Sequence, residues 1–366
     1  MAIIVQTVLI MSGIAGSLAL MLTLANLYIA NYGECKIIIN SDKEYVVDGG
    51  GTLLSLLNEQ ELYLPSACGG KGTCGLCTCR ILEGGGPVLP TETPFFTKAE
   101  LEDNMRLSCQ VKVKQDMKLV IPEDLLNAKK YEAVVELIRD ETPTIKLLRF
   151  KITDGQEIEF KAGQYVQLLA PPYPGNPENV YRAYSVASSA AEKEAIELII
   201  GFVQEGLVTT YVHQHLAKGD EVSFNGPFGD FYLRDSDAEI VMIAVGTGIA
   251  PIRSILYQMK DQQIERKAVF FFGARTEKDL VCADEMYAFE ESIPNFSFKP
   301  VLSRVGDDSD WKGDKGRVTD SIQQYIDNAD NKEAYMCGSP AMIESAIKEL
   351  KKKGFTAETI FFDDFG

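Results

Sequence analysis

Histidine is scarce in this sequence of 366 residues, which contains only His213 and His215. A metal centre that needs several imidazoles, or a haem with two histidine ligands, is therefore hard to build. Basic residues are also few, with 36 Lys and Arg against 53 Asp and Glu, and the formal net charge of -17 would repel a polyanion. The composition therefore argues against nucleic acid as a partner and leaves cysteine for any metal chemistry.

Charged side chains are absent from residues 1–33, and the first one is Glu34. The apolar stretch 3–29 exceeds the roughly 20 residues that are needed to cross about 30 Å of hydrocarbon. A cleaved signal peptide is the alternative, but such a peptide has a basic N-terminal region and a shorter apolar run. The stretch predicts an N-terminal transmembrane helix.

Four of the eight cysteines crowd between Cys68 and Cys79, which a spread disulfide framework does not produce. Cys68, Cys74 and Cys77 follow the pattern C-x5-C-x2-C, and Cys109 follows after 31 intervening residues. Four thiolates can hold a 2Fe-2S cluster, and the glycines of SACGGKGTCGLCTC let the backbone wrap it and direct N–H groups at sulfur. A zinc site is the alternative, although it usually pairs two short CxxC knuckles. These four cysteines are the predicted cluster ligands, and Cys79 is expected to be a packed thiol.

The chain is too long for one ordinary domain, and its patterning changes along its length. After the apolar stretch comes a small β-rich region around the cysteines, then short β-type runs between turns that predict an antiparallel barrel. The last third has mostly apolar runs separated by helical patterns, which is typical of a doubly covered parallel sheet. The expected domains of this multidomain α+β and α/β protein are 1–33, 34–128, 129–234 and 235–366.

Arg182, Tyr184 and Ser185 stand together in the segment RAYS, at an expected strand start. An arginine can pair with pyrophosphate, an aromatic ring can stack on an isoalloxazine, and a hydroxyl can hydrogen-bond the ring where hydride arrives. This combination suits a flavin. Downstream, a helix is expected to open where its N–H groups and hydroxyls could bind phosphate, a simple helix cap being the alternative. The candidate phosphate ligands are Gly206, Thr209 and Thr210.

Two glycine turns follow apolar strands in the last third. After IVMIAV comes GTGIAP, whose free N–H groups could meet a pyrophosphate as a helix opens at Pro251. It is not a plain GxGxxG, because proline stands where a third glycine would pack helix on strand and no acidic residue ends the next strand. After EAYM comes CGSP, for whose Cys337 a buried structural thiol is the alternative. The candidate nucleotide-binding residues are Gly246, Thr247, Gly248, Pro251, Cys337, Gly338 and Pro340.

In this order, RAYS, GLVTT, GPFG, GTGIAP and CGSP resemble the FAD-binding and NAD(P)-binding lobes of the ferredoxin-NADP reductase superfamily. The cysteine loop resembles a ferredoxin-type domain, with one residue more in its first gap than the plant pattern. The resemblance implies a β-grasp ferredoxin domain, a β-barrel FAD domain and a doubly wound NAD domain. It also implies that Arg182 contacts the flavin phosphates, that Tyr184 and Ser185 line the isoalloxazine, and that the CGSP turn lies beside the nicotinamide. It implies that the terminal aromatic Phe365 shields the flavin until nicotinamide displaces it, a frayed tail being the alternative.

The whole chain resembles the NqrF family, a class of subunits of Na+-translocating NADH:quinone oxidoreductases. The resemblance implies an enzyme that moves hydride from NADH to FAD, then single electrons to a 2Fe-2S cluster and on to membrane subunits, with quinone or another carrier as the eventual acceptor. It implies a single-pass protein of the inner (cytoplasmic) membrane whose soluble domains face the cytoplasm. One departure is the short loop 171–181, where the family leads us to expect an insertion. NADPH stays open, because Arg275 could meet a 2′-phosphate.

Two other functions are compatible with the same modules. One is an anchored NADH-dependent reductase component of a mono- or dioxygenase, which would differ only in its electron acceptor. The other is a non-catalytic, ferredoxin-like redox module with regulatory nucleotide lobes, against which the full set of nucleotide motifs speaks.

Overall fold

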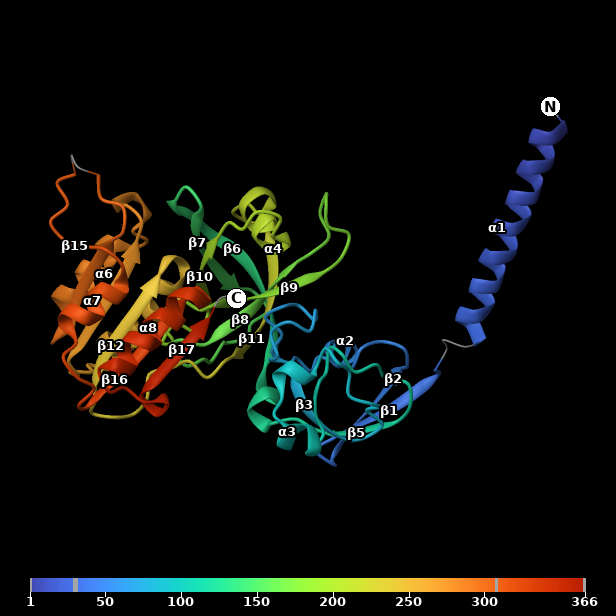
Figure 1. Ribbon diagram of the computed structural model, residues 1–366, viewed down its shortest axis with the longest axis horizontal. Coiled ribbons are helices and arrows are strands. Elements are labelled where there is room, and N and C mark those ends of the chain that lie inside the picture. The colour runs from blue at the N-terminus through green and yellow to red at the C-terminus, as the bar shows by residue number, and fades with distance from the viewer. Residues whose placement is uncertain (1, 29–31, 307–308, 365–366) are drawn as a thin grey trace. The chain divides into compact units, whose positions relative to one another are not determined.

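The structure is a computed structural model, and its elements are shown in Figure 1. It describes residues 2–28, 32–306 and 309–364. Contacts divide the chain into two compact units. The first is made of Met1–Leu64 and Gly70–Asn127, and the second of Pro65–Gly69 and Ala128–Gly366.

The charge-free N-terminal segment forms one helix, α1 (Ala2–Tyr28). The hydroxyls of Ser17 and Thr23 donate to the carbonyls of Ile14 and Ala19, so the helix satisfies these polar groups itself. Several side chains of α1 lie outside the described residues. Among the residues that are described, no helix is long and apolar enough to cross a membrane, and the predicted transmembrane helix is not confirmed.

The rest of the first unit is a five-stranded sheet with one helix packed against it. The strand order is β2-β1-β5-β3-β4, with β1 and β5 parallel and the other pairs antiparallel. Thr52 caps helix α2 by accepting a hydrogen bond from the Ser55 N–H, and four leucines of α2 are buried in the core with the cysteine-bearing strand β3. The elements are β1 (Glu34–Ile39), β2 (Lys43–Asp48), α2 (Leu53–Glu59), β3 (Thr78–Glu83), α3 (Lys98–Glu102), β4 (Met105–Leu107) and β5 (Met117–Val120).

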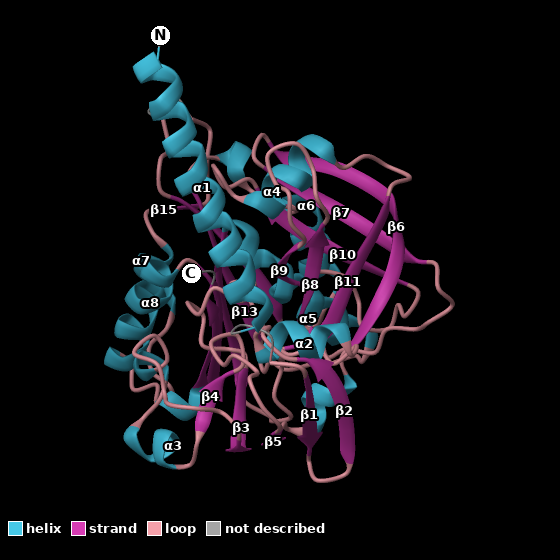
Figure 2. Cartoon of the chain, turned by 90° about the vertical axis from the view of Figure 1, so that its right-hand side faces the viewer, coloured by secondary structure: helices cyan, strands magenta, loops and turns pink. Residues whose placement is uncertain are grey.

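The second unit begins with an antiparallel lobe, the six-stranded sheet β10-β7-β6-β11-β8-β9. The sheet curls, as the curved strands β6 and β7 show in Figure 2, and a bridge between Val186 and Leu198 links the chain after its edge strand β9 to the opposite edge strand β10. The enclosed core is made of alternate strand residues such as Phe150, Leu168 and Phe224. The elements are β6 (Lys129–Thr142), β7 (Ile145–Ile152), β8 (Tyr165–Ala170), β9 (Val180–Ser185), β10 (Ala195–Gly201), α4 (Leu207–Thr210) and β11 (Glu221–Phe228).

The parallel lobe follows, with six parallel strands in the order β15-β14-β13-β12-β16-β17. Two separate apolar cores cover the two faces of the sheet, one shared with α5 and α6 and the other with α7 and α8. The elements are β12 (Glu239–Val245), α5 (Ile249–Asp261), β13 (Ala268–Ala274), α6 (Ala283–Ser292), β14 (Phe296–Leu302), β15 (Asp314–Lys315), α7 (Val318–Tyr325), β16 (Lys332–Gly338), α8 (Pro340–Lys352) and β17 (Ile360–Asp364).

The predicted antiparallel and doubly covered parallel sheets are both confirmed. The helix expected to open near Gly206 is α4, which the π-helical turn Tyr211–His215 follows. One local prediction is wrong, because RAYS ends strand β9 instead of starting it. The strand already begins at Val180, which pairs with Ala170 on β8.

Candidate functional site

The two glycine turns of the parallel lobe meet at one point of the sheet. They follow β12 and β16, which lie side by side, while the chain leaves β12 towards β13 on its other side. In open α/β sheets, ligands bind at such a switch in strand order, outside the carboxyl ends of the strands. A Cβ atom on Gly248 would lie 2.2 Å from the carbonyl oxygen of Cys337 and 3.0 Å from the nitrogen of Gly338. Only glycine at position 248 lets the two turns touch.

The residues around these turns leave backbone N–H groups for a ligand. Gly246 has a left-handed φ of 55°, which glycine adopts without strain. Pro251 is the third residue of α5 and Pro340 is the first of α8, so neither proline removes an N–H that the helix needs. The structure thus brings the predicted nucleotide-binding residues of the two turns together. Backbone N–H groups at such turns can bind a pyrophosphate.

A carboxyl group joins these turns from the end of the chain. Strand β17 pairs with β16 so that Asp363 lies opposite Cys337. The Ser185 hydroxyl, from the antiparallel lobe, donates to Asp363 Oδ2 at 3.5 Å. Burial raises the pKa of Asp363 to about 6, and the charge of Asp364 adds to the effect while the Ser185 hydrogen bond opposes it. The site therefore holds a carboxyl that titrates near neutral pH.

Sequence reasoning missed Asp363. The available signal is the segment IFFDD, whose β-type composition indicates a strand that ends at the two aspartates. Phe365 lies outside the described residues. Cys337 is fully buried, and burial raises the pKa of its thiol well above the usual value, with the charges of Asp363 and Asp364 adding to this. Cys337 is therefore a neutral thiol at pH 7.

In the antiparallel lobe, strand β9 presents the RAYS residues on two faces. Arg182 and Tyr184 share one face because they are two positions apart, and Ser185 at the strand end points the other way, towards Asp363. Burial raises the pKa of the Tyr184 phenol, which the nearby charge of Arg182 partly offsets. One Arg182 Nη1 donor is used by the Tyr181 carbonyl at 2.7 Å. The arrangement offers a cation and a ring on one side and a hydroxyl on the other.

The predicted phosphate-binding turn lies at α4, which has only four residues. Gly206 is its N-cap, and the Thr210 N–H donates to the Gly206 carbonyl at 2.8 Å. The Thr209 hydroxyl accepts the Val203 N–H at 3.2 Å and lies within 3.2 Å of the Val203 and Gly206 carbonyls. Thr209 therefore closes its own turn, and a phosphate contact here would come from backbone N–H groups.

The first unit carries the cysteine loop. The thiols of Cys77 and Cys109 are hydrogen-bond partners, and this contact together with burial raises the pKa of Cys77. Gln110 Nε2 lies 3.5 Å from Cys109 Sγ. Cys68 belongs to the segment Pro65–Gly69, which the contacts assign to the second unit. Within the described parts of the chain, no group of three or more His, Cys, Asp or Glu is arranged to hold a metal ion.

Two features of this loop fit an iron-sulfur cluster. Gly70, Gly72 and Gly75 have φ values of 84°, 72° and 73°, a left-handed conformation that lets successive N–H groups turn towards a bound anion. The Ser108 hydroxyl is buried beside the Cys77 thiol, whose pKa it lowers, and it has no nitrogen or oxygen hydrogen-bond partner among the described residues. A cluster sulfur would give this hydroxyl an acceptor. Thiolate chemistry and backbone conformation therefore suit the group.

Cys79 lies apart from the loop, on strand β3. Its side chain is buried in the core of the first unit, and burial raises its pKa to about 12. Nearby, Arg106 Nη2 lies 2.7 Å from Glu92 Oε2 in a buried ion pair, and the same guanidinium donates to the carbonyls of residues 85–87. The placement agrees with a packed thiol.

Three family models match consecutive parts of the chain. They are a 2Fe-2S iron-sulfur cluster binding domain at residues 37–114, an oxidoreductase FAD-binding domain at residues 133–232 and an oxidoreductase NAD-binding domain at residues 242–348. The predicted cofactors, a 2Fe-2S cluster, FAD and NADH, are confirmed by these matches.

Relatives cover the whole chain. The NqrF protein of the Na+-translocating NADH-quinone reductase of Neisseria gonorrhoeae is 35% identical over 408 aligned positions, which cover 100% of this chain and 99% of the relative. The NqrF protein of a Marinomonas species is 34% identical, with 99% and 98% covered. The chain belongs to the NqrF family. The first alignment is longer than the chain, so the relative has residues without a counterpart here.

Solved structures support the architecture of this NqrF chain. A cytochrome P450 reductase from Amycolatopsis, GcoB, matches with a TM-score of 0.74 and 26% identity, covering 90% of this chain and 98% of that one. A ferredoxin reductase in carbazole 1,9a-dioxygenase matches with a TM-score of 0.70 and 22% identity, covering 91% and 98%, and shows the fold alone. The chain is thus an NADH-dependent flavin and iron-sulfur oxidoreductase with the three modules in the predicted order.

Proposed function

We propose that this chain is the NADH-oxidising subunit of a membrane quinone reductase complex of the Na+-translocating kind. When bound, FAD supplies the conversion of a two-electron hydride into single electrons, and the 2Fe-2S cluster supplies one-electron transfer. The observation that carries the proposal is the meeting of the GTG turn, the CGSP turn and Ser185 at one end of the parallel sheet. The proposed domains are 1–33, 34–128, 129–234 and 235–366.

The nucleotide is held by the parallel lobe. The N–H groups of Gly246, Thr247 and Gly248 would bind the pyrophosphate. Cys337 and Gly338 form a close wall beside the nicotinamide, and the neutral Cys337 thiol keeps that wall uncharged. The chemistry then depends on placing the nicotinamide next to the flavin ring, which needs no general base.

The flavin is held by the antiparallel lobe. Arg182 would pair with its phosphates, Tyr184 would contact the isoalloxazine, and the N–H groups that begin with Gly206 would add phosphate contacts. Ser185 directs its hydroxyl at the ring. While Asp363 is ionised it accepts the Ser185 hydrogen bond, and once Asp363 is protonated the Ser185 O–H is released to donate to another acceptor, such as the ring.

The iron-sulfur cluster is held by Cys68, Cys74, Cys77 and Cys109, for which the Cys77–Cys109 contact and the buried Ser108 hydroxyl give support. Cys74→Ser tests this assignment and the order of transfer together. We expect NADH to bleach the flavin at the normal rate, while transfer to a membrane quinone falls to background because the cluster is lost or altered. Stopped-flow absorbance, quinone reduction by membranes and electron paramagnetic resonance measure the three quantities. Normal quinone reduction in the variant would contradict the proposed conduit.

The chain is anchored through its N-terminal segment, and its soluble domains face the side that supplies NADH, the cytoplasm. Support comes from the absence of charge in residues 1–33 and from the single helix α1 that this segment forms. The partners are membrane subunits of the redox complex. The alternative acceptor, an oxygenase, shares all three modules and is distinguished by identifying the chains that co-purify with the native protein. Phe365 is proposed to cover the flavin by resemblance alone.

A further inference from the structure

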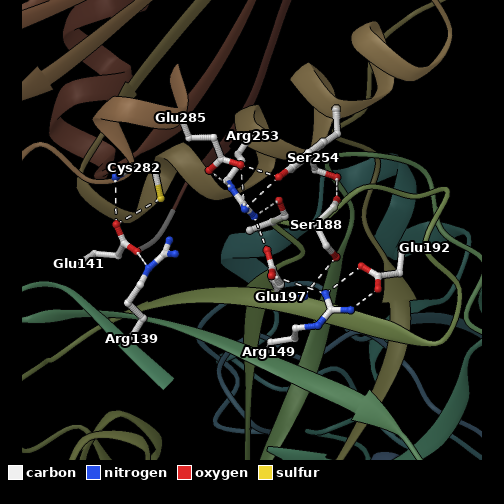
Figure 3. Close-up of polar contacts among 12 residues, drawn as sticks. Arg139, Glu141, Arg149, Ser188, Glu192, Glu197, Arg253, Ser254, Cys282 and Glu285 are labelled. Atoms are coloured by element: carbon white, nitrogen blue, oxygen red, sulfur yellow. Dashed lines mark hydrogen bonds and ion pairs between the residues drawn. The ribbon is translucent and has the colours of Figure 1, made fainter. Parts of the chain in front are cut away.

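Arg253 is a buried arginine at the start of the helix that leaves the nucleotide turn. Its side chain is 5% exposed, yet its N–H donors all have partners (Figure 3). Nε and Nη2 donate to Glu285 at 2.7 and 3.0 Å, and Nη2 also reaches the Tyr257 hydroxyl at 3.2 Å. Nη1 donates to the Ala187 carbonyl at 2.8 Å and to Glu197 Oε2 at 2.7 Å.

The partners of this arginine are divided between the two lobes. Glu285 lies on α6 of the parallel lobe, whereas Glu197 lies on β10 of the antiparallel lobe and Ala187 follows the end of β9. The next residue repeats the connection, because the Ser254 hydroxyl donates to the Ser188 carbonyl at 2.7 Å. The contacts therefore cross from one lobe to the other at two consecutive positions of α5.

These contacts join the two halves of the reaction site by a short covalent path. Ala187 is two residues beyond Ser185, which faces the flavin, and Arg253 is two residues beyond Pro251 of the nucleotide turn. Each of the two contact residues, Ala187 and Arg253, is thus only two positions along the chain from a residue of the proposed flavin or nucleotide site. A displacement at Arg253 would thus move the nucleotide turn against Ser185.

The residues of the antiparallel lobe that accept these hydrogen bonds are held by further contacts within that lobe. The Glu197 N–H donates to Ser188 Oγ at 3.1 Å, and the Glu197 carbonyl accepts the Ala187 N–H at 2.7 Å. Glu197 Oε1 lies 3.6 Å from Arg149 Nη1, and Arg149 is also held by Glu136. The carboxylate that receives Arg253 is therefore also held by contacts within its own lobe.

A second contact between the lobes limits rotation about the first. Glu141, at the end of β6, accepts the Cys282 N–H at 3.2 Å where helix α6 begins, and Arg139 Nε holds Glu141 at 2.6 Å. Since α6 also carries Glu285, the two contacts attach the first turn of α6 and the second turn of α5 to different strands of the antiparallel lobe. Two separated contacts define the orientation of the parallel lobe relative to the antiparallel lobe, which a single contact would leave free to rotate.

Apolar packing alone would not define this orientation. Residues such as Leu147 and Ile199 of the antiparallel lobe already share one core with α5 and α6, and such packing is non-directional. Burying a guanidinium and carboxylates opposes folding unless their geometry is well satisfied. We propose that Arg253 is a positioning residue, which through Glu197 and the Ala187 carbonyl sets the orientation of the nucleotide turn towards Ser185 and thereby the approach of NADH to the flavin. This inference rests on the proposed function.

The chain offers a matched pair of variants for the test. Glu197→Ala removes the carboxylate that receives Arg253 across the lobes, and Glu285→Ala removes the carboxylate that receives the same guanidinium within one lobe. In Glu197→Ala we expect flavin reduction at saturating NADH to slow about tenfold or more, with a weaker NADH–flavin charge-transfer band and an NADH dissociation constant within about twofold of wild type. Glu285→Ala should keep the wild-type rate and band. Glu197→Gln, which keeps the hydrogen bond, should recover part of the rate.

A measurement on the flavin-free protein separates orientation from cofactor loss. Amide hydrogen exchange of residues 186–200 and 249–256 should be faster in Glu197→Ala than in Glu285→Ala when both are compared at equal distance below their melting temperatures. Equal rates of flavin reduction in the two alanine variants, or a wild-type rate in Glu197→Ala, would overturn the positioning role. Wild-type protein that NADH fails to reduce would instead reject the proposed function itself.

Discussion

Gly248→Ala tests the contact between the two glycine turns. The added Cβ atom would lie 2.2 Å from the carbonyl oxygen of Cys337 and 2.6 Å from its carbonyl carbon. Both neighbours are backbone atoms of a fully buried residue, so no side chain can rotate away. Since the φ of Gly248 is -61°, alanine itself fits the conformation, and the effect is steric.

The size of the effect follows from the overlap. A non-bonded carbon and oxygen sit about 3.2 Å or more apart, so the turns must separate by about 1 Å. Overpacking of this kind costs about 1–3 kcal/mol, and each kcal/mol lowers the melting temperature of a unit of this size by about 2–4 °C. A misplacement of about 1 Å at the reacting groups lowers the rate by about 100-fold.

Thermal unfolding and stopped-flow bleaching of the flavin by NADH measure both effects. Gly246→Ala is the comparison, because a Cβ there meets nothing within 4 Å and adds only the strain of a left-handed alanine, about 1–2 kcal/mol. We expect NADH at saturating concentration to reduce the flavin of Gly248→Ala much more slowly than the flavin of Gly246→Ala. A Gly248→Ala protein with the melting temperature and reduction rate of wild type would refute the reasoning.

Two further predictions concern the ends of the chain. Asp363→Asn removes a carboxyl whose pKa burial raises to about 6. This pKa exceeds the ordinary value of about 3.9, so the wild-type protein should lose up to about 3 kcal/mol of stability as pH rises from about 4 to above 6. The variant should not show this loss. Denaturant unfolding at pH 4.5 and pH 7.5 measures this, and identical pH dependence in both proteins would contradict it. Deletion of residues 1–33 should move the protein from the membrane to the soluble fraction with NADH-driven flavin reduction retained, and a truncated protein that still sediments with membranes would argue against the anchor.

Local patterns were enough to predict where the two glycine turns lie. In the first of them, the buried strand β12, the glycines and the start of α5 are consecutive in the sequence, so one short segment contains the information. The left-handed glycines of the cysteine loop are likewise a local feature. The start of β9 was misplaced because the proline-rich residues before it obscured Val180, whose pairing with Ala170 depends on β8.

Residues whose role depends on distant partners could not be predicted. Asp363 meets Ser185 from 178 positions away, and only the pairing of β17 with β16 brings it there. Arg253 stands in a helix with mixed polarity, where a charged residue is usually exposed. It is buried because Glu197 and Glu285 reach it from 56 and 32 positions away. Such complementary charges leave no periodic pattern in the sequence.

The burial of Cys79 has a consequence for its reactivity. Because β3 pairs with β4 and β5, the Cys79 thiol is enclosed in the core, and its pKa of about 12 keeps it protonated. The thiolate, not the thiol, binds metals and reacts with oxidants. Strand pairing therefore withdraws Cys79 from the chemistry of the cysteine loop that precedes it in the sequence.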